Sequence, residues 1–393
     1  MAVAMLTLVA SCSSADTDKL TDREPGPSGQ VAGAPREDVP SALDDRDNPA
    51  FPPPLIDRDE LISGGPPPDG IPAIDAPAFE QADRVDWLED NEAVLSLTVG
   101  GQTRAYPLRV MTWHEIVNDV VGGVPVAVTY CPLCNSGVAF RRTVIGHGVL
   151  SFGTSGLLYA DNLVMYDRQT ESLWPQLTGE ASVGDLTGTQ LVAIPMGTVA
   201  WRDFVTAYPT ARVLSQDTGF NRPYGTNPYS GYDDPDGDLL FGLPDQLENR
   251  LPVKERVVGL VDGSVSVAVV RSSLVGGDPL EVTIGSRHLV VWHQSGQASA
   301  LDADTVAGGA DIGTVGVFVP VLDGERLHFE SRSTGFVDRE TGSSWNVLGR
   351  STAGPLRGAE LEPYQHLDTV WFAWASFHLD TGVLAAPARK GAS

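Results

Sequence analysis

The sequence predicts an α+β domain that is rich in β-strands, has a few short helices and is built from two internal repeats. Short apolar or alternating runs punctuated by glycine, such as residues 94–99 and 124–130, have the periodicity of strands. The repeat is visible in "DRQTESLW" at 167–174, which recurs as "DRETGSSW" at 338–345, each followed by matching glycines and leucines. Short connections and many glycines argue against alternating βαβ units.

The chain begins with an apolar stretch that resembles a bacterial lipoprotein signal. Residues 1–11 are interpreted as a signal peptide, because "VASC" places small residues directly before Cys12. Cleavage before Cys12 and acylation of its thiol would anchor the protein to the cell membrane on the extracytoplasmic side. The alternative is an ordinary apolar N-terminus of a cytoplasmic protein, since the basic residues that normally open a signal peptide are absent.

The next segment has the composition of a tether. Residues 12–69 are dominated by Ser, Asp, Gly and Pro, and such a stretch buries too little apolar surface to offset the entropy of the chain. We therefore expect a disordered tether that holds the domain away from the membrane.

The folded part divides into two copies of one unit. We expect a first repeat at 70–217, a turn-rich linker at 218–253, a second repeat at 254–386 and a tail at 387–393. The linker contains Tyr224, Tyr229 and Tyr232, which could line a ligand surface or cap the core.

Three stretches have helical spacing. Residues 107–121 place apolar side chains at helix spacing after a proline suited to a first turn. Residues 199–208 and their counterpart at 369–378 are expected to form the other helices.

The composition of the chain limits the classes of function that it can have. The 393 residues, 42% of them hydrophobic, suffice for a substantial core. A formal charge of −25, from 26 basic and 51 acidic residues, repels polyphosphates, so nucleic acid is not an expected partner. Protein partners are left open, and no run of about eighteen apolar residues predicts a membrane-spanning helix.

The two cysteines of "TYCPLCNSGVAF" are the main candidates for chemistry. Cys131 and Cys134 follow a predicted strand, and their spacing lets both sulfurs point at one atom. Soft thiolates favour copper or zinc, and a tetrahedral site would need further ligands, for which His114 and Met165 are the candidates. Proline between the cysteines also resembles a glutaredoxin-type motif, and a structural disulfide or a pair of structural thiols is the third interpretation.

Three other polar residues are noted, two with a structural interpretation and one without an assigned role. Asp167 and Arg168 recur in the second copy, which has no cysteine, so they are interpreted as a pair that fixes a turn at a strand end. Glu115 lies next to His114 on a polar face that could flank a site. The usual signatures of phosphate loops, serine hydrolases and zinc proteases are absent, and no residue is assigned a catalytic role.

Several long motifs together resemble the prokaryotic family known as domain of unknown function 3179. They are "SGGPPPDGIPAID", "WHEIVNDVVGGVPVAVTYCPLCNSGVAF", "NLVMYDRQTESLW" and "NPYSGYD", and the resemblance runs from about residue 60 to about residue 384. It implies an exported or lipid-anchored protein and brings no established reaction. Its recurrent motif residues fall here on His114, Glu115, Cys131, Cys134, Asp167 and Arg168.

The sequence therefore predicts a membrane-anchored extracytoplasmic lipoprotein that binds a soft metal ion, copper or zinc, through Cys131 and Cys134. One alternative is a thiol-disulfide redox protein, in which Cys131 attacks and Cys134 resolves. The other is a noncatalytic envelope scaffold or interaction protein, in which the pair only secures a loop.

Overall fold

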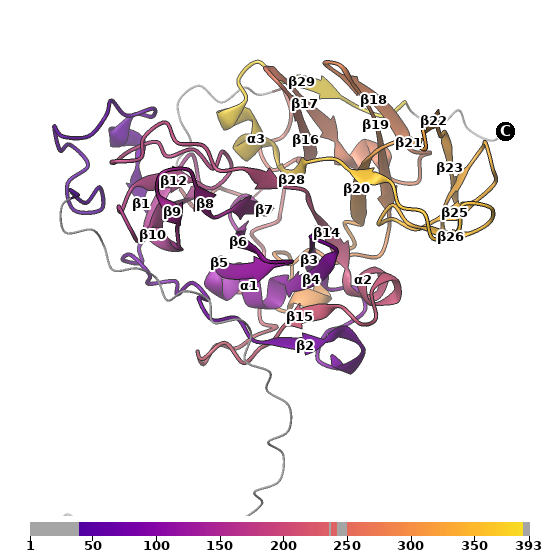
Figure 1. The fold of residues 1–393 in the computed structure, drawn as a ribbon, viewed down its shortest axis with the longest axis horizontal. Coiled ribbons are helices and arrows are strands. Elements are labelled where there is room, and N and C mark those ends of the chain that lie inside the picture. The colour runs from indigo at the N-terminus through magenta and orange to yellow at the C-terminus, as the bar shows by residue number, and fades with distance from the viewer. Residues whose placement is uncertain (1–38, 236, 242–249, 388–393) are drawn as a thin grey trace, which may run out of the picture.

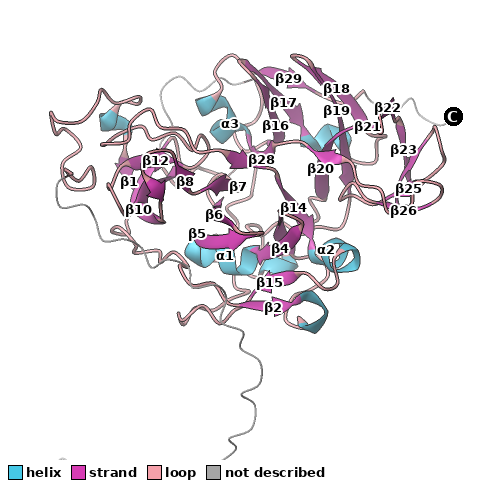
Figure 2. Ribbon diagram, viewed as in Figure 1, coloured by secondary structure: helices cyan, strands magenta, loops and turns pink. Residues whose placement is uncertain are grey.

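The computed structural model describes residues 39–235, 237–241 and 250–387. The expected signal peptide, Cys12, the first part of the expected tether and the end of the tail lie outside these residues. Within them the chain is β-rich and its three α-helices are each seven residues long (Figures 1 and 2). These are α1 (Leu108–His114), α2 (Trp201–Ala207) and α3 (Trp371–Phe377). None of the described helices is long and apolar enough to cross a membrane.

The first half of the chain forms three main sheets. The first has the order β14 (Met196–Ala200), β3 (Ala93–Val99), β4 (Gln102–Pro107), β15 (Arg212–Leu214) and β2 (Phe79–Gln81). The second has the order β13 (Ala193–Ile194), β7 (Ser136–Arg141), β6 (Val124–Cys131) and β5 (Ile116–Val121). The third has the order β1 (Ile62–Ser63), β10 (Phe152–Tyr159), β11 (Asn162–Asp167) and β12 (Leu173–Pro175), and a small hairpin joins β8 (Thr143–Val144) to β9 (Gly148–Val149).

The second half also forms three main sheets, and most of their strands follow the order of the first half. Its first sheet is β28 (His366–Val370), β16 (Arg256–Asp262), β17 (Val265–Val270) and β29 (Gly382–Leu384), and its last pair is parallel, as β4 and β15 are in the first half. Its second sheet is β18 (Leu280–Ile284), β19 (Arg287–Gln294), β20 (Thr314–Val319) and β27 (Glu362–Pro363). Its third sheet is β23 (Phe329–Arg332), β24 (Gly335–Asp338), β25 (Ser344–Trp345) and β26 (Ser351–Ala353), with a hairpin of β21 (Val321–Leu322) and β22 (Glu325–Arg326).

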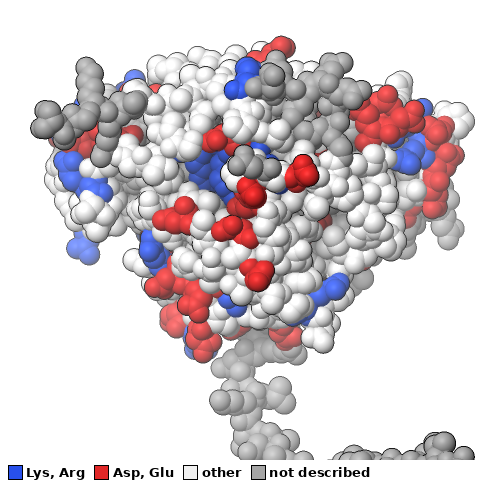
Figure 3. Space-filling view, turned by 180° about the vertical axis from the view of Figure 1, so that it is seen from behind, with Lys and Arg blue, Asp and Glu red and all other residues white. Residues whose placement is uncertain are grey.

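Four 3₁₀ turns complete the described elements. They are η1 (Arg58–Glu60), η2 (Ala82–Arg84), η3 (Arg271–Leu274) and η4 (Val306–Gly308). Acidic side chains are spread over the face seen in Figure 3, in keeping with the net charge of the chain.

The helix predicted at 107–121 is wrong in its second half. Helix α1 ends at His114, and Glu115 then has a φ of 58°, which turns the chain out of the helix. Strand β5 follows and pairs with β6 over its whole length. Because "IVNDVV" is rich in β-branched residues, pairing with a neighbouring strand outweighs the helical spacing of its valines. The helices predicted at 199–208 and 369–378 are present as α2 and α3.

The expected tether is not free of the domain over residues 39–69. Ala42 and Leu61 are buried in a cluster with residues of β11, and β1 pairs with β10. Arg168 also forms an ion pair with Asp69, with 3.1 Å between nitrogen and oxygen. The tether interpretation is wrong for this part, because its few apolar residues pack against the sheet that contains β10 and β11. The average composition of the segment does not reveal such packing.

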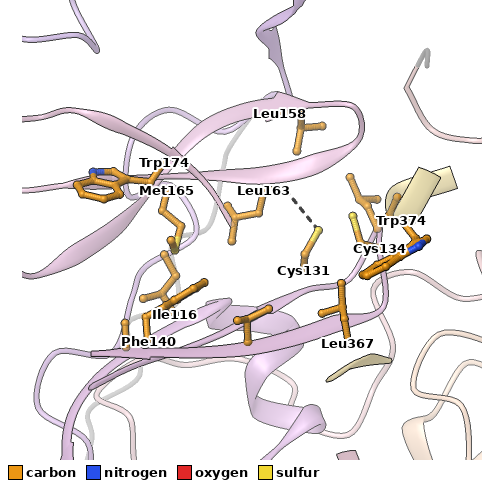
Figure 4. Packing of buried hydrophobic residues seen from close by; sticks show 14 of the residues in the cluster. Ile116, Cys131, Cys134, Phe140, Leu158, Leu163, Met165, Trp174, Leu367 and Trp374 are labelled. Atoms are coloured by element: carbon orange, nitrogen blue, oxygen red, sulfur yellow. Dashed lines mark hydrogen bonds between the residues drawn. The ribbon is translucent and has the colours of Figure 1, made fainter. Parts of the chain in front are cut away.

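The main core joins the two halves. Cys131, Cys134 and Leu163 from the first half share one buried cluster with Leu367 and Trp374 from the second (Figure 4). The candidate site therefore lies where the halves pack together.

Candidate functional site

The two cysteines flank a tight turn between paired strands. Strand β6 ends at Cys131, β7 begins at Ser136, and the N–H of Asn135 donates a hydrogen bond to the carbonyl oxygen of Pro132 at 3.0 Å. Both thiols are free and buried, with exposed fractions of 1% for Cys131 and 0% for Cys134. The Thr369 hydroxyl from β28 holds this turn by donating to the Cys134 carbonyl oxygen at 2.8 Å.

The two sulfurs converge on the turn between β10 and β11. The carbonyl oxygen of Asp161 lies 3.4 Å from Sγ of Cys134 and 3.9 Å from Sγ of Cys131. The N–H of Leu163 donates to Sγ of Cys131 at 3.4 Å (Figure 4), and the side-chain amide of Asn162 donates to Sγ of Cys134 at 3.5 Å. Backbone geometry thus positions both thiols against one short segment.

The pKa values of the two thiols are shifted in opposite directions. Burial by itself raises the pKa of Cys131, but hydrogen bonds from the Cys134 thiol, the Leu163 N–H and the Cys134 N–H outweigh burial and place the pKa below its ordinary value. Burial and the neighbouring Cys131 raise the pKa of Cys134 well above its ordinary value. Cys131 is therefore the thiol that ionises first, with Cys134 as its proton-bearing neighbour.

A pocket of ≈ 210 Å³ reaches Cys131 but not Cys134. Its walls come from the N-terminal segment, the cysteine turn, strands β10 and β11, and the segment between the halves. Most of the lining is apolar, and the reactive side chains among the lining residues are Glu115, Cys131 and Tyr229. The pocket therefore offers one thiol, one carboxyl and one phenol to a small molecule.

Glu115 is held at this pocket by an unusual backbone conformation. Its φ of 58° lies in the region that few side chains other than glycine adopt, and its side chain is buried. Burial raises the pKa of Glu115 well above its ordinary value, and the nearby Cys131 raises it further, whereas a hydrogen bond from Tyr229 lowers it in part. Glu115 thus binds its proton more tightly than an ordinary glutamate does, and it lies beside the thiol whose pKa is lowered.

A second buried carboxyl, Asp161, lies behind the thiols. Ala160 and Asp161 form a two-residue hairpin turn with φ values of 50° and 56°, a conformation usually occupied by Asn-Gly. Neither carboxyl oxygen of Asp161 has a close hydrogen-bond partner within the described part of the chain, and burial raises its pKa to about 7, while the nearby backbone N–H of Phe241 lowers the pKa in part. The charge of Lys254 acts in the opposite direction, and Lys254 itself donates to the carbonyl oxygen of Tyr232 at 2.8 Å.

Asp161 belongs to none of the predicted site residues, and Tyr229 is predicted only as one of three linker tyrosines. Ala-Asp is not a typical turn pair, and it lies near the cysteines because the sheet of β10 and β11 packs against the cysteine turn, 30 positions away in the chain from Asp161 to Cys131. The described part of the linker is more than a connection, because it covers the site with Tyr229 and Tyr232. The signal in the sequence that could have pointed to Asp161 is an acidic residue in a short turn between two apolar strands.

The two further metal-ligand candidates, His114 and Met165, do not lie beside the two thiols. His114 has both ring nitrogens occupied, Nδ1 by the carbonyl oxygen of Pro72 at 2.7 Å and Nε2 by the hydroxyl of Tyr224 at 2.6 Å. Met165 lies beside Trp174 and away from the cysteines (Figure 4). Among the residues that the structure describes, no group of three or more His, Cys, Asp or Glu side chains could hold a metal ion.

Asp167 and Arg168 have structural contacts. The buried Asp167 carboxylate accepts hydrogen bonds from the Thr170 N–H at 2.7 Å and from the indole N–H of Trp174 at 2.9 Å. Arg168 forms an ion pair with Asp75 at 2.7 Å, in addition to the one with Asp69. Both residues therefore secure the frame of the site and lie outside the pocket lining.

The fold and site define a β-rich protein with a buried dithiol at the wall of a small apolar pocket. Over residues 68–381 the chain matches the family described as "Protein of unknown function (DUF3179)". The chain therefore belongs to the DUF3179 family. No curated protein and no solved structure gives a significant match.

Proposed function

We propose that this protein is a dithiol redox protein in which Cys131 attacks a small oxidant and Cys134 resolves the product. The observation that carries the proposal is the asymmetry of the pair. Cys131 lines the pocket and has the lowered pKa, whereas Cys134 is closed off from the pocket and lies within hydrogen-bond reach of Cys131. A nucleophilic thiol with a second thiol behind it is the arrangement that dithiol exchange requires.

With a small disulfide as oxidant, the reaction proceeds in two displacements. The Cys131 thiolate bonds to one substrate sulfur, the substrate S–S bond breaks, and the other half leaves as a thiolate. Cys134 then loses its proton and attacks Sγ of Cys131, which forms the Cys131–Cys134 bond and releases the second thiolate. Two electrons pass to the substrate, and the protein becomes a disulfide.

Thiol counting and mass spectrometry test the proposal in a Cys12→Ser background, which leaves only two thiols. We expect one reversible disulfide between Cys131 and Cys134 after oxidation with a small apolar disulfide. Cys134→Ser should stop at a mixed disulfide on Cys131, and Cys131→Ser should not react. Thiols that react with small oxidants only after unfolding would contradict the proposal and favour a structural role for the pair.

Copper or zinc binding is the competing proposal from the sequence. The two sulfurs do converge, and two thiolates alone suit Cu(I) better than Zn²⁺, which prefers four ligands. Metal analysis of the reduced protein decides between the proposals. Stoichiometric metal that is lost in the double Cys131→Ser, Cys134→Ser variant, together with inert thiols, favours metal binding over redox exchange.

We also propose that Cys12 carries a lipid and holds the protein on the extracytoplasmic side of the cell membrane. The support is the "VASC" sequence and the Pro-rich composition that follows it. Labelling with an alkyne fatty acid tests this directly. Label should appear in the membrane fraction and disappear in Cys12→Ser, and unlabelled protein in the soluble fraction would contradict the anchor.

The two halves are proposed to descend from one duplicated unit. The support is the largely shared strand order and a shared hydrogen-bond network, since Asp338 accepts from the indole N–H of Trp345 at 2.8 Å just as Asp167 accepts from Trp174. Superposition of residues 84–214 on 254–384 should bring each aspartate onto its counterpart. An optimal superposition that separates these pairs would contradict duplication.

A further inference from the structure

The pocket restricts which oxidants reach Cys131. An apolar cavity of about 150 Å³ holds one benzene molecule, so ≈ 210 Å³ accommodates an aromatic ring with a short substituent or a short alkyl chain. Cys131 is only 1% exposed, so a disulfide between two folded proteins does not reach it without opening the site. The substrate is therefore a small molecule.

The lining also selects for a neutral, apolar body. It includes Leu157, Leu158, Leu163 and Phe241, and the carboxyl among the described lining residues is that of Glu115, whose pKa burial raises. The described lining residues include no lysine or arginine, so they offer no partner charge to an anionic ligand. The reactive end of the ligand must lie at the polar end of the pocket.

That polar end combines a nucleophile with an acid. Glu115 lies near enough to Cys131 for their charges to interact and accepts a hydrogen bond from the Tyr229 hydroxyl. A thiolate leaving group, whose conjugate acid has a pKa of about 8.5, departs without help from an acid. An alkoxide is about as basic as hydroxide and far more basic than a thiolate, so it needs a proton as it leaves. An acid beside the attacked atom therefore favours an oxygen leaving group.

The second thiol narrows the class of substrate further. Transfer of an acyl group to Cys131 would require one thiol only. A sulfenic acid formed on Cys131 condenses with a neighbouring thiol to a disulfide, and Cys134 is in place for this. A neutral oxidant with an oxygen leaving group fits all of these conditions.

We propose that the pocket binds small apolar organic hydroperoxides, which Cys131 reduces to alcohols while Glu115 protonates the departing alkoxide. This inference rests on the proposed dithiol function and names its substrate class. The Cys131 thiolate attacks the terminal oxygen of ROOH, a sulfur–oxygen bond forms, and the O–O bond breaks. The leaving RO⁻ takes the proton of Glu115 and becomes ROH, and the proton lost earlier by Cys131 restores Glu115.

The resulting sulfenic acid is resolved within the pair. Cys134 gives up its proton and attacks Sγ of Cys131, the sulfur–oxygen bond breaks, and the oxygen leaves as water. The net reaction converts two thiols and ROOH into one disulfide, ROH and water. A small external dithiol then reduces the disulfide and is itself oxidised.

The test compares two oxidants of similar size on the reduced full-length chain: cumene hydroperoxide and the aryl disulfide methyl phenyl disulfide, whose benzenethiolate leaves without a proton. Glu115→Gln should slow the reaction with cumene hydroperoxide about 100-fold and change the reaction with the aryl disulfide less than about 3-fold. Cys134→Ser should accumulate a sulfenic acid on Cys131 that dimedone traps. Equal slowing of both oxidants by Glu115→Gln would overturn the role of Glu115.

A second pair of variants tests the pocket if Glu115→Gln fails to fold. Leu158→Trp should fill the pocket and slow cumene hydroperoxide more than about 10-fold while hydrogen peroxide still reacts. Leu379→Trp is the matched control, because Leu379 is 60% exposed and outside the pocket lining. Oxidation by the aryl disulfide but not by any hydroperoxide would overturn this inference and leave the dithiol function intact. Failure of both oxidants would overturn both proposals.

Discussion

Asp161 offers a test of the electrostatics behind the thiols. Asp161→Asn keeps the shape of the side chain and removes its charge at all pH values. Asn also tolerates the positive φ of 56° well, so the substitution adds no backbone strain. The comparison of the two proteins therefore isolates the buried charge.

The sign and size of the effect follow from the pKa of Asp161. Burial raises it from an ordinary 3.8 to about 7, so the folded state binds the proton more tightly than the unfolded state. This contribution to stability is fully present below pH 3.8 and is lost as the pH rises through about 7. At about 1.4 kcal/mol per tenfold change in proton binding, the upper bound is about 4 kcal/mol. Because the effective dielectric constant around buried groups in proteins is higher than that of a dry interior, we expect about 2 kcal/mol.

Urea unfolding at pH 4 and pH 8 measures the difference. At pH 4 the two proteins should unfold with nearly the same free energy, since both side chains are neutral. At pH 8 Asp161→Asn should be more stable than the wild type by about 2 kcal/mol. A difference that does not change between the two pH values, or a less stable variant at pH 8, would refute the buried unpaired carboxylate.

Three further predictions concern the frame of the site. Gly156→Ala should lower the free energy of unfolding by at least about 2 kcal/mol, because φ is +75° and the new Cβ would lie 2.0 Å from a backbone oxygen of the N-terminal segment. The control Gly188→Ala, at φ +88° in open space, should lose only about 1 kcal/mol, and equal losses in urea would contradict the contact. Asp338→Ala should lose about 2–3 kcal/mol in the same assay because it leaves a buried indole N–H without an acceptor, and a neutral result would show that the network contributes nothing. Arg168→Lys should speed proteolysis before residue 69, since it loses the two-oxygen contact with Asp75, and unchanged cleavage would argue that apolar packing alone holds the segment.

The predictable part of the fold is the part governed by local pattern. Short apolar or alternating runs predict β3, β6 and β11, and the counterpart segments 199–208 and 369–378 predict α2 and α3. The same reasoning failed after His114, where "IVNDVV" satisfies both a helical and a strand pattern. The strand conformation prevails because this segment pairs with β6, the next strand along the chain.

The candidate site shows the same division. The nearness of Cys131 to Cys134 follows from their spacing in sequence. The expected contribution of His114 did not follow, because Tyr224, 110 positions away, occupies its ring nitrogen. A histidine's partners depend on packing between distant segments, and single-sequence reasoning has no access to that packing.

The sequence by itself determined the β-rich class, the recurrence of the Asp-Arg-x-Thr turn, the acidic character and the pair of thiols at a strand end, because each depends on residues close together in the chain. Only the tertiary structure decided which thiol faces a pocket and which acids surround it. Glu115, Tyr229 and Asp161 reach the cysteines from three separate segments, and burial among them alters the acidity of every group. Such acidity is a property of the shared low-dielectric surroundings, which exist only after the halves have packed together.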